Sequence, residues 1–336
     1  MSSLRTYVIG RILLTFPMVW VLVTIVFLIL RVMPGDPCLA ILRENATKAQ
    51  LDNCRRGLGI DRPILVQYAN YLTGLAQGDL GMSMTRRRPV ALEIADRFPA
   101  TIELAIWSML VTVVVGISTG AYAAQKRKSP ADYTLRVFSI VIYSMPIFWF
   151  GLILQLIFGL KLGLMPTYGR IGTELAPRAV TGLYVLDSIL TLNWPSLVSA
   201  LWHLILPSLT LGLVLSGIFT RLTRANMLDV LRQDFITSGR ARGIPEFSLV
   251  YGHALKNAFI PILTLMGLQF AILLGGAILT ESTFSWPGMG RLLVERIYDR
   301  DFATVQGVVT LFAVIVAFTS LLVDVTYAYI DPRIRY

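Results

Sequence analysis

Few side chains in this chain of 336 residues are of the types that bind metals or form covalent bonds. The two cysteines, Cys38 and Cys54, belong to no Cys-x-x-Cys pair and to no Cys/His cluster, and the two histidines, His203 and His253, lie far apart in the sequence. We therefore predict no metal site. In an oxidising compartment the two thiols could form a disulfide, but spacing alone does not fix the geometry, so two free thiols remain the alternative.

The sequence also lacks the common catalytic patterns. It has no G-x-x-x-x-G-K-[ST] phosphate loop, and neither histidine belongs to an H-E-x-x-H motif. An intramembrane hydrolase is disfavoured because no Ser/His arrangement falls within the apolar runs. We therefore expect a chain that is not an enzyme, has no catalytic residue and binds no cofactor of its own.

The composition places the chain in a membrane. Apolar residues make up 55% and charged residues 15%, and the mean hydropathy is +0.67, whereas soluble domains carry about 25% charged residues. The formal net charge of +10 would suggest nucleic-acid binding in a soluble protein. In a membrane protein, however, Lys and Arg collect in cytoplasmic loops beside anionic lipid, so we predict no nucleic-acid partner.

Six charge-free runs are long enough to span a bilayer, because about 22 residues of helix measure about 33 Å and the hydrocarbon core is about 30 Å thick. Bases outnumber acids in the short loops 126–136 and 221–257 but not in 281–301, which predicts that both termini are cytoplasmic. We predict an all-α membrane protein with six transmembrane helices in a single domain, 1–336, whose fourth helix begins near His203 or slightly before. The runs are 12–30, 104–125, 137–160, one ending at 220, 258–280 and 302–323.

The long segment 33–99 is predicted to be an organised outer loop with helices of its own. Thr47 with Gln50 is a capping box that begins one helix, and Pro63 begins a second. Pro89 begins a third, which leads into the second span. Their apolar stripes predict helices that lie on the membrane surface or cap the bundle.

Two further outer segments are predicted. Segment 161–202 is rich in Pro and Gly, so we expect irregular structure there. Segment 281–301 is predicted to contain a turn at Trp286-Pro287-Gly288 followed by an amphipathic helix, with Phe284 and Trp286 at the membrane interface. Glu103 and Glu281 fall at the outer ends of spans, where an acid is usually interfacial.

A polar, basic segment at 221–257 separates the fourth and fifth spans. Apolar residues recur at helical spacing over 225–242, which predicts one helix there. Gly243-Ile244-Pro245 ends it, and a short amphipathic helix follows from Glu246 to Asn257. Such a helix is suited to insert into a groove on a partner. A basic loop lying on lipid headgroups is the alternative.

This segment resembles the cytoplasmic loop of permease subunits of binding-protein-dependent ABC importers, in particular the dipeptide/oligopeptide branch. That branch typically reads Ala-Arg-Ala-Lys-Gly followed by His-x-Leu-x-Asn-x-x-x-Pro. The matching residues here are Gly239-Arg240-Ala241-Arg242-Gly243, His253, Leu255, Asn257 and Pro261. The chain departs from the general family pattern, because Thr237-Ser238-Gly239 stands in place of Glu-Ala-Ala. Other motifs resembling this branch are Met33-Pro34-Gly35-Asp36-Pro37, Gly57-Leu58-Gly59-Ile60-Asp61-Arg62-Pro63, Gly78-Asp79-Leu80-Gly81, Ser144-Met145-Pro146, Phe284-Ser285-Trp286-Pro287-Gly288 and Asp331-Pro332-Arg333.

The resemblance implies a type I ABC importer permease fold in the lipid of the cell (inner) membrane. It implies a second permease subunit, expected to form a heterodimer with this chain, and two ATPase subunits that bind ATP and Mg. It also implies an extracytoplasmic substrate-binding protein. Di- or oligopeptides are the expected cargo, with nickel complexes and oligosaccharides as alternatives. Coupling to the ATPases is expected to involve Gly243, Glu246, Phe247, His253 and Leu255, with the glycine as a hinge and the following helix as a rigid lever.

The translocation path is expected near Ser144, Met145, Gln269 and Gly275. Ser144-Met145-Pro146 would be able to kink the third span, whereas small residues in the fifth span, such as Gly275, could equally serve helix packing. A self-contained channel or ion-coupled carrier is the remaining rival. It is disfavoured because neither inverted repeats nor several charges within the spans are visible.

Overall fold

The computed structural model describes residues 4–32, 37–42, 46–275 and 277–330 of the chain. Within these ranges all regular structure is helical, apart from one isolated bridge between Met82 and Pro89. The elements are α1 (Leu4–Val32), α2 (Pro37–Leu42), α3 (Lys48–Leu58), α4 (Ile64–Ala76), α5 (Val90–Gln125), α6 (Pro130–Ser144), α7 (Ile147–Leu154), the π-helix η1 (Gln155–Lys161), α8 (Tyr184–Leu190), α9 (Trp194–Val230), α10 (Asp234–Ala241), the π-helix η2 (Ser248–Ala254), α11 (Leu255–Leu274), α12 (Ile278–Thr283), α13 (Met289–Tyr298) and α14 (Phe302–Ile330).

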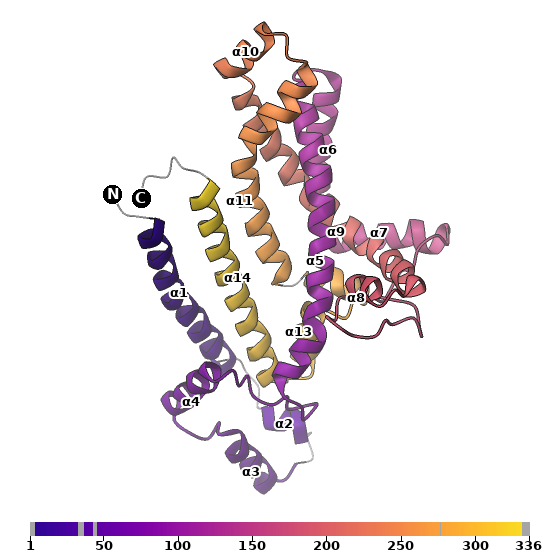
Figure 1. Ribbon diagram of the computed structural model, residues 1–336. Helices are drawn as coiled ribbons and strands as arrows, with labels where there is room; N and C mark the ends of the chain where they lie inside the picture. Colours follow the sequence, from indigo (N-terminus) through magenta and orange to yellow (C-terminus); the bar gives the residue numbers. More distant parts are fainter. Residues whose placement is uncertain (1–3, 33–36, 43–45, 276, 331–336) are drawn as a thin grey trace.

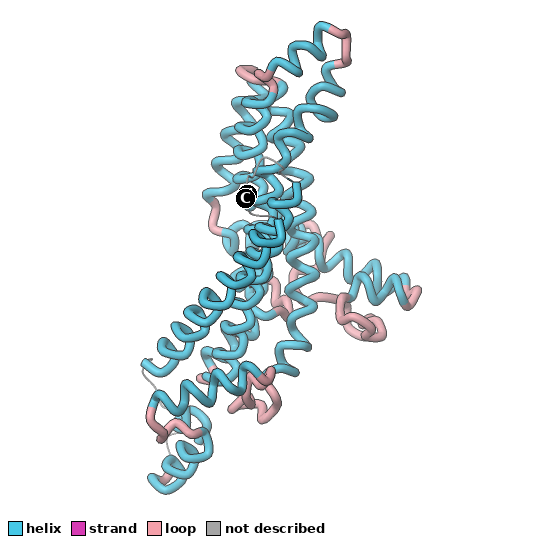
Figure 2. The backbone as a smooth tube through the Cα atoms, turned by 60° about the vertical axis from the view of Figure 1, so that its left-hand side comes forward, coloured by secondary structure: helices cyan, strands magenta, loops and turns pink. Residues whose placement is uncertain are grey.

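Long helices run along the length of the molecule, and short helices gather at its two ends (Figure 1). The short helices α2, α3 and α4 lie at one end and α10 at the other. Helices α7 and α8 project to one side of the bundle (Figures 1 and 2). The two ends of the molecule are therefore built from different parts of the chain.

Five described helices are long and apolar enough to cross a membrane, and a sixth span is present if α6 with α7 and η1 counts as one broken span. The sequence predicted one third span over 137–160, which Ser144-Met145-Pro146 would be able to kink. In the structure, α6 and the helix pair after it meet at 102°. The break falls at Ser144-Met145-Pro146, the predicted kink. Met145 is extended, with ψ 134°, a conformation that the steric clash with the following proline favours over the helical one.

Helices α5 and α9 approach each other closely because glycines line their contact. A Cβ atom on Gly116 would lie 2.5 Å from the Cβ of Phe219, and one on Gly120 would lie 2.6 Å from the Cβ of Thr223. Gly212 makes an equally close approach from the α9 side. Small residues allow such close packing between membrane helices. These two helices, of 36 and 37 residues, form the spine of the bundle.

Helix α9 begins earlier than the sequence predicted. Its first residue is Trp194, not a residue near His203. The Asn193 side chain caps the helix by accepting a hydrogen bond from Ser196 N at 3.2 Å, and Pro195 occupies the first turn. Both features are standard helix-start signals. The fifth span also differs from the predicted run 258–280, because α11 ends at Leu274 and a separate helix, α12, follows.

The outer segment contains the helices that its capping signals predicted. Thr47 Oγ1 accepts from Gln50 N at 3.4 Å and Gln50 Oε1 accepts from Thr47 N at 2.9 Å, so the capping box is confirmed. The third predicted helix is the first part of α5, which begins at Val90 directly after Pro89. Helix α4 packs against α1. The rings of Phe27 in α1 and Tyr71 in α4 stack with their centroids 5.6 Å apart.

A disulfide joins Cys38 of α2 to Cys54 of α3, and the two Cα atoms are 5.9 Å apart. The bond closes a loop with a sequence separation of 16 residues. Cross-links of this kind restrict mainly the unfolded chain. The small helices of this segment, which have little apolar surface to bury between them, are thus held together covalently.

The turn and amphipathic helix predicted over 281–301 are present, with α13 as the helix. Phe284 and Trp286 are not interfacial, however: they are 1% and 0% exposed. Trp286 Nε1 donates to Ala100 O at 2.8 Å. Glu281 is likewise fully buried, and its carboxylate accepts from Thr101 Oγ1 at 2.7 Å. The prediction of an interfacial segment was wrong because the turn folds inward against α5.

Glu103 is also buried instead of interfacial. Its Oε2 accepts from Arg170 Nε at 2.8 Å, and both side chains are almost fully buried. The Arg170 guanidinium lies 3.8 Å above the ring of Tyr184 and donates to Gly182 O at 2.7 Å. These contacts fasten the segment before α8 to α5.

Candidate functional site

The 221–257 segment forms the end of the molecule that carries α10 (Figure 1). Helix α9 extends into it as far as Val230, as the sequence predicted for an extension of the fourth span. The single helix predicted over 225–242 was wrong, because the chain turns at 231–233 and α10 starts afresh. Gln233 is extended, with ψ 153°, and Asp234 lies in the first turn of α10, where the helix dipole favours an acid.

Gly243 provides the turn between α10 and the next helix. Its φ of +78° is in the left-handed region, which glycine adopts without the steric cost of a Cβ atom. Its N–H donates to Arg240 O at 2.9 Å, and Ile244 N donates to Gly239 O at 3.1 Å. These bonds satisfy the last carbonyls of α10 as in other glycine-terminated helices.

One face of η2 rests on the ends of α5 and α9. Leu249 and Val250 are buried in an apolar cluster with Ala124 and Met227. At Gly239, α10 comes so close to η2 that a Cβ atom would lie 2.6 Å from Leu249 Cδ2. The segment is therefore packed onto the bundle through its apolar face.

The helix that begins after the Gly243 turn does not end at Asn257. It passes from η2 directly into α11, which runs to Leu274. The prediction of a short helix broken on both sides was therefore wrong at its C-terminal end. A continuous rod instead connects the exposed segment to the middle of the bundle.

Phe247 is the most exposed large apolar residue of this segment: 72% of its surface is accessible, compared with 37% for Phe235. Its ring packs against that of Tyr251 with centroids 4.7 Å apart. Arg240 Nε and Nη2 donate to the Glu246 carboxylate beside it at 3.0 and 2.7 Å. Aromatic residues are enriched in protein–protein interfaces.

The Arg240–Glu246 ion pair joins α10 to the first turn of the next helix, across the Gly243 turn. The hydrogen bonds from Arg240 lower the pKa of Glu246 from its ordinary value of 4.5, against a smaller opposing effect of burial. Both side chains are half-exposed. The carboxylate is therefore ionised at neutral pH, and the pair is complete there.

Of the five predicted coupling residues, four share the exposed surface. Gly243, Glu246, Phe247 and His253 are exposed, whereas Leu255 is half-buried and packs against the apolar cluster beneath the helix. Four of the predicted residues therefore lie on the exposed surface, and the fifth, Leu255, belongs to the apolar packing beneath it.

Of the predicted path residues, Gln269 of α11 lines a cavity of about 250 Å³, which is also lined by Ile147, the first residue of α7. Ser144 and Met145 lie at the break in the third span, before Pro146, and are not among the residues that line this cavity. Gly275 does not line the cavity, and instead caps the C-terminal end of α11.

Two protein-family models match the sequence of this chain. Residues 116–336 match the family described as the inner membrane component of binding-protein-dependent transport systems, and residues 4–105 match the N-terminal part of such membrane components. This chain belongs to that family. The permease is accordingly a membrane protein, as its long apolar helices require.

Individual relatives resemble the permease over almost its whole length. The dipeptide transport system permease protein DppB of Alkalihalophilus pseudofirmus is 41% identical over 330 residues, which cover 98% of this chain and 99% of the relative. DppB of Escherichia coli is 37% identical over 334 residues, 98% of each chain. The glutathione transport system permease protein GsiC of Escherichia coli is 39% identical over 330 residues, 98% of this chain and 99% of the relative.

Sequence reasoning missed the partners that hold the permease's exposed segment in place. The contact of Gly239 with Leu249 links two helices, and no local signal marks it. Arg240 and Glu246 are opposite charges six residues apart on either side of a glycine turn. That spacing was a usable signal, because a turn between the two residues reverses the chain and brings them together.

Proposed function

We propose that the permease is the transmembrane subunit of an ABC importer that carries di- or oligopeptides across the inner membrane. ATP hydrolysed on partner subunits drives the transport. The single observation that carries the coupling role is Phe247, an exposed aromatic residue on a helix that continues unbroken into α11. The cargo assignment is supported by relatives named for dipeptides and for glutathione, which is itself a small peptide.

The proposed assembly contains a second, different permease subunit and two ATPases that hold ATP and Mg. An extracytoplasmic binding protein delivers the cargo. Both termini and the 221–257 segment face the cytoplasm, and segment 33–99 faces outward. The excess of Lys and Arg in the short loops supports this orientation, as does the position of α2–α4 at the end opposite α10 (Figure 1).

In the proposed mechanism, movement of the ATPases is transmitted through the exposed helix. Gly243 separates this helix from α10 and allows it to change direction. Phe247 fills a pocket on the ATPase, and η2 and α11 form one rod, so displacement of Phe247 moves Gln269. The cavity that Gln269 shares with the broken third span then changes shape, in keeping with domain movements transmitted by rigid elements.

Two variants test the coupling role in the assembled transporter. Phe247→Asp removes the exposed aromatic side chain without disturbing the buried face of the helix. Gly243→Pro cannot adopt the φ of +78° that the turn has, since proline fixes φ near −65°. Both should insert normally and lose cargo-stimulated ATP hydrolysis, by about tenfold or more for a hot-spot aromatic residue.

A matched control is Tyr168→Asp, which changes another exposed aromatic residue away from α10 and η2. It should leave stimulated hydrolysis unchanged. Copurification of the ATPase measures docking separately from turnover. Wild-type ATPase retention and wild-type stimulated hydrolysis in Phe247→Asp would refute the coupling role.

Cargo is tested by identifying the ligand that copurifies with the partner binding protein. Mass spectrometry should find small peptides in the binding protein. Vesicles that contain the purified complex should transport a labelled dipeptide only when ATP is present on the side of the membrane that the ATPase subunits face. Recovery of a nickel complex or an oligosaccharide, with no peptide uptake, would replace the cargo but leave the coupling role in place.

A further inference from the structure

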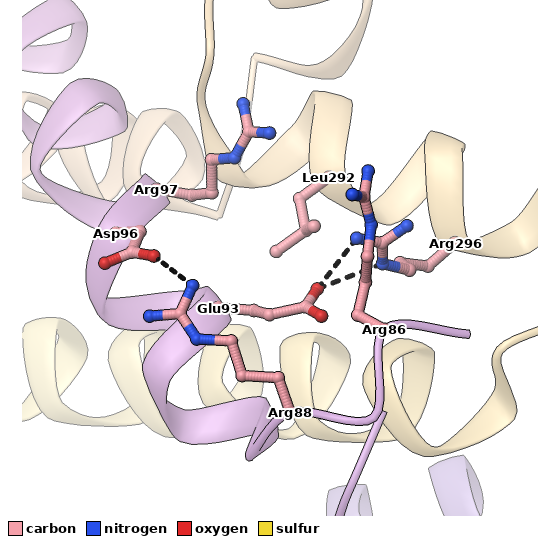
Figure 3. Close-up of a pocket in the computed structure, with 7 residues that line it drawn as sticks. All are labelled: Arg86, Arg88, Glu93, Asp96, Arg97, Leu292 and Arg296. Carbon is pink, nitrogen blue, oxygen red and sulfur yellow. Dashed lines mark hydrogen bonds and ion pairs between the residues drawn. The ribbon is translucent and has the colours of Figure 1, made fainter. Parts of the chain in front are cut away.

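A charged cavity of about 280 Å³ lies between the turn 82–89, the first turns of α5, and α13. These elements are at the end of the molecule opposite α10 (Figure 1). Figure 3 shows the side chains that line the cavity. Four guanidinium groups face two carboxylates, which leaves a surplus of two positive charges. The lining residues are Arg86, Arg88, Arg97, Arg296, Glu93, Asp96 and Leu292.

Glu93 is held by Arg296 and still lacks one hydrogen bond. Arg296 Nε and Nη2 lie 3.0 and 2.9 Å from Glu93 Oε2. Glu93 is only 6% exposed, and its other oxygen, Oε1, has no hydrogen-bond partner among the residues that the structure describes. An unsatisfied buried acceptor is costly and calls for an explanation. The wall of the cavity therefore contains a buried carboxylate whose hydrogen bonding the described part of the chain leaves incomplete.

Two of the four guanidinium groups have no carboxylate partner within the described ranges. Arg88 is paired with Asp96 at 2.6 Å, but neither Arg86 nor Arg97 forms such an ion pair. The charge of Arg97 acts on the buried Glu281 at longer range, which leaves its N–H donors uncommitted. In the view of Figure 3, Arg97 and Arg86 stand on opposite sides of Leu292. Their planar groups match the geometry of an incoming carboxylate.

The turn that carries Arg86 is fixed by contacts of its own. Ser83 Oγ and Thr85 Oγ1 donate to the buried Asp301 at 2.5 and 3.0 Å. Arg86 N donates to Ser83 Oγ at 3.0 Å. A site held in place in this way loses little conformational freedom when a ligand binds.

We propose that this cavity receives an acidic side chain of the soluble binding protein. The carboxylate lies between Arg86 and Arg97. The inference rests on the proposed function, which supplies a soluble protein at this end of the permease. A protein surface is favoured over a small anion because the positive charge continues outside the cavity on the exposed Arg87. Charge spread beyond a pocket steers an approaching protein.

The test uses the complete transporter in lipid nanodiscs, titrated with its purified, cargo-loaded binding protein. The readout is the binding-protein concentration that gives half-maximal stimulation of ATP hydrolysis. In R86E/R97E this concentration should rise by about tenfold or more at low salt, because one side of a charge pair becomes repulsive. The difference from wild type should shrink as salt is added. R86Q/R97Q should show a smaller rise in the same direction.

The matched control is R87E, which reverses a charge next to Arg86 but outside the cavity. It should raise the half-maximal concentration by a smaller factor than R86E/R97E does, because an exposed charge at an interface rim contributes only to steering. Thermal unfolding of each purified complex reports whether the variants are folded. An equal shift in R87E and R86E/R97E would overturn the proposal, because a general charge effect would then explain both.

A wild-type response with an unchanged half-maximal concentration in R86E/R97E overturns this inference and leaves the proposed function standing. A wild-type complex that the binding protein does not stimulate overturns the proposed function and the inference together. If only exchange of anionic for zwitterionic lipid distinguishes the variants, the occupant is a lipid phosphate and the proposal is wrong. Restoration of R86E/R97E by a single Asp→Lys or Glu→Lys change on the binding protein identifies the carboxylate and supports it.

Discussion

At the scale of single residues, two glycines four positions apart meet different physical requirements. Gly243 is needed for its conformation: its φ is +78° and no atom lies within 4 Å of where a Cβ would be. Gly239 is needed for space, since a Cβ there would press on Leu249. Gly243 therefore sets the direction of the helix that carries Phe247, and Gly239 sets the distance between that helix and α10.

The Arg240–Glu246 pair predicts a pH dependence of the turn between them. Because Arg240 lowers the pKa of Glu246, the stabilisation is complete above the ordinary value of 4.5 and is lost as the pH falls through the lowered value. Both side chains are half-exposed, so the coupling energy should be at most about 1 kcal/mol.

A double-mutant cycle of Arg240→Gln and Glu246→Gln measures this coupling through the hydrogen-exchange protection of the Ile244 amide, which donates to Gly239 O. The coupling should be present at neutral pH and decline in acid. The Glu246→Gln variant alone should lack the acid-dependent change. A coupling energy that stays constant into acid would contradict the assignment.

At the scale of elements, the contact between α5 and α9 is set by glycine spacing. Gly116 and Gly120 are four residues apart, so both face α9 from one side of α5. The backbone O of Thr220 would lie 2.7 Å from a Cβ on Gly120. Backbone cannot move aside as a flexible side chain can, and the two helices must separate if the glycine is replaced.

Gly120→Ala is therefore expected to destabilise the permease by about 1–3 kcal/mol, the usual cost of overpacking. Thermal unfolding in detergent measures the loss. Gly10→Ala in α1 is the matched control, because no atom lies within 4 Å of the added Cβ. It should be neutral or stabilising by up to about 1 kcal/mol through helix propensity. Equal effects of the two variants would show that α5 and α9 are not in tight contact.

At the scale of the whole molecule, different interactions hold the two ends. The end with α10 rests on an apolar cluster shared by α5, α9 and η2. The opposite end has an apolar cluster of its own, shared by α5, α13 and α14. The buried carboxylate of Asp301, the ion pair of Glu93 with Arg296 and the disulfide between α2 and α3 add to it. Reduction of the disulfide should therefore affect this end selectively.

The disulfide predicts both the location of segment 33–99 and its stability. In membranes from growing cells, a thiol-reactive polymer should label Cys38 and Cys54 only after reduction, because disulfides persist in oxidising compartments outside the cytoplasm. Reduction should expose the segment to protease, since closing a loop of about 15 residues contributes about 3 kcal/mol. The end with α10 should keep its protection.

The single variant Cys38→Ser is the control, because it leaves the half-buried Cys54 without its partner, and this thiol should be labelled without reduction. A gel shift measures the labelling. Immediate labelling of both wild-type cysteines would place the segment in a reducing compartment and contradict the proposed orientation.

Much of the fold could be predicted where a structural signal is local. The capping box at Thr47, the turn at Gly243 and the break at Ser144-Met145-Pro146 each depend on a few neighbouring residues, and each is present. The predictions that were wrong concern surroundings. Trp286 was assigned to the membrane interface because its residue type favours that position, but its neighbours in space come from α5.

The sequence by itself determined the membrane class, the approximate positions of the apolar spans and some of the residues at which helices start and turn, such as Thr47, Pro89 and Gly243. Hydropathy, capping and backbone sterics act within a few residues, so they can be read along the chain. Tertiary structure alone decided which charges are paired. Glu93 and Arg296 are separated by 203 positions, and their meeting depends on how α5 and α13 pack. For the same reason the charged cavity and its unsatisfied oxygen could not be found from the sequence.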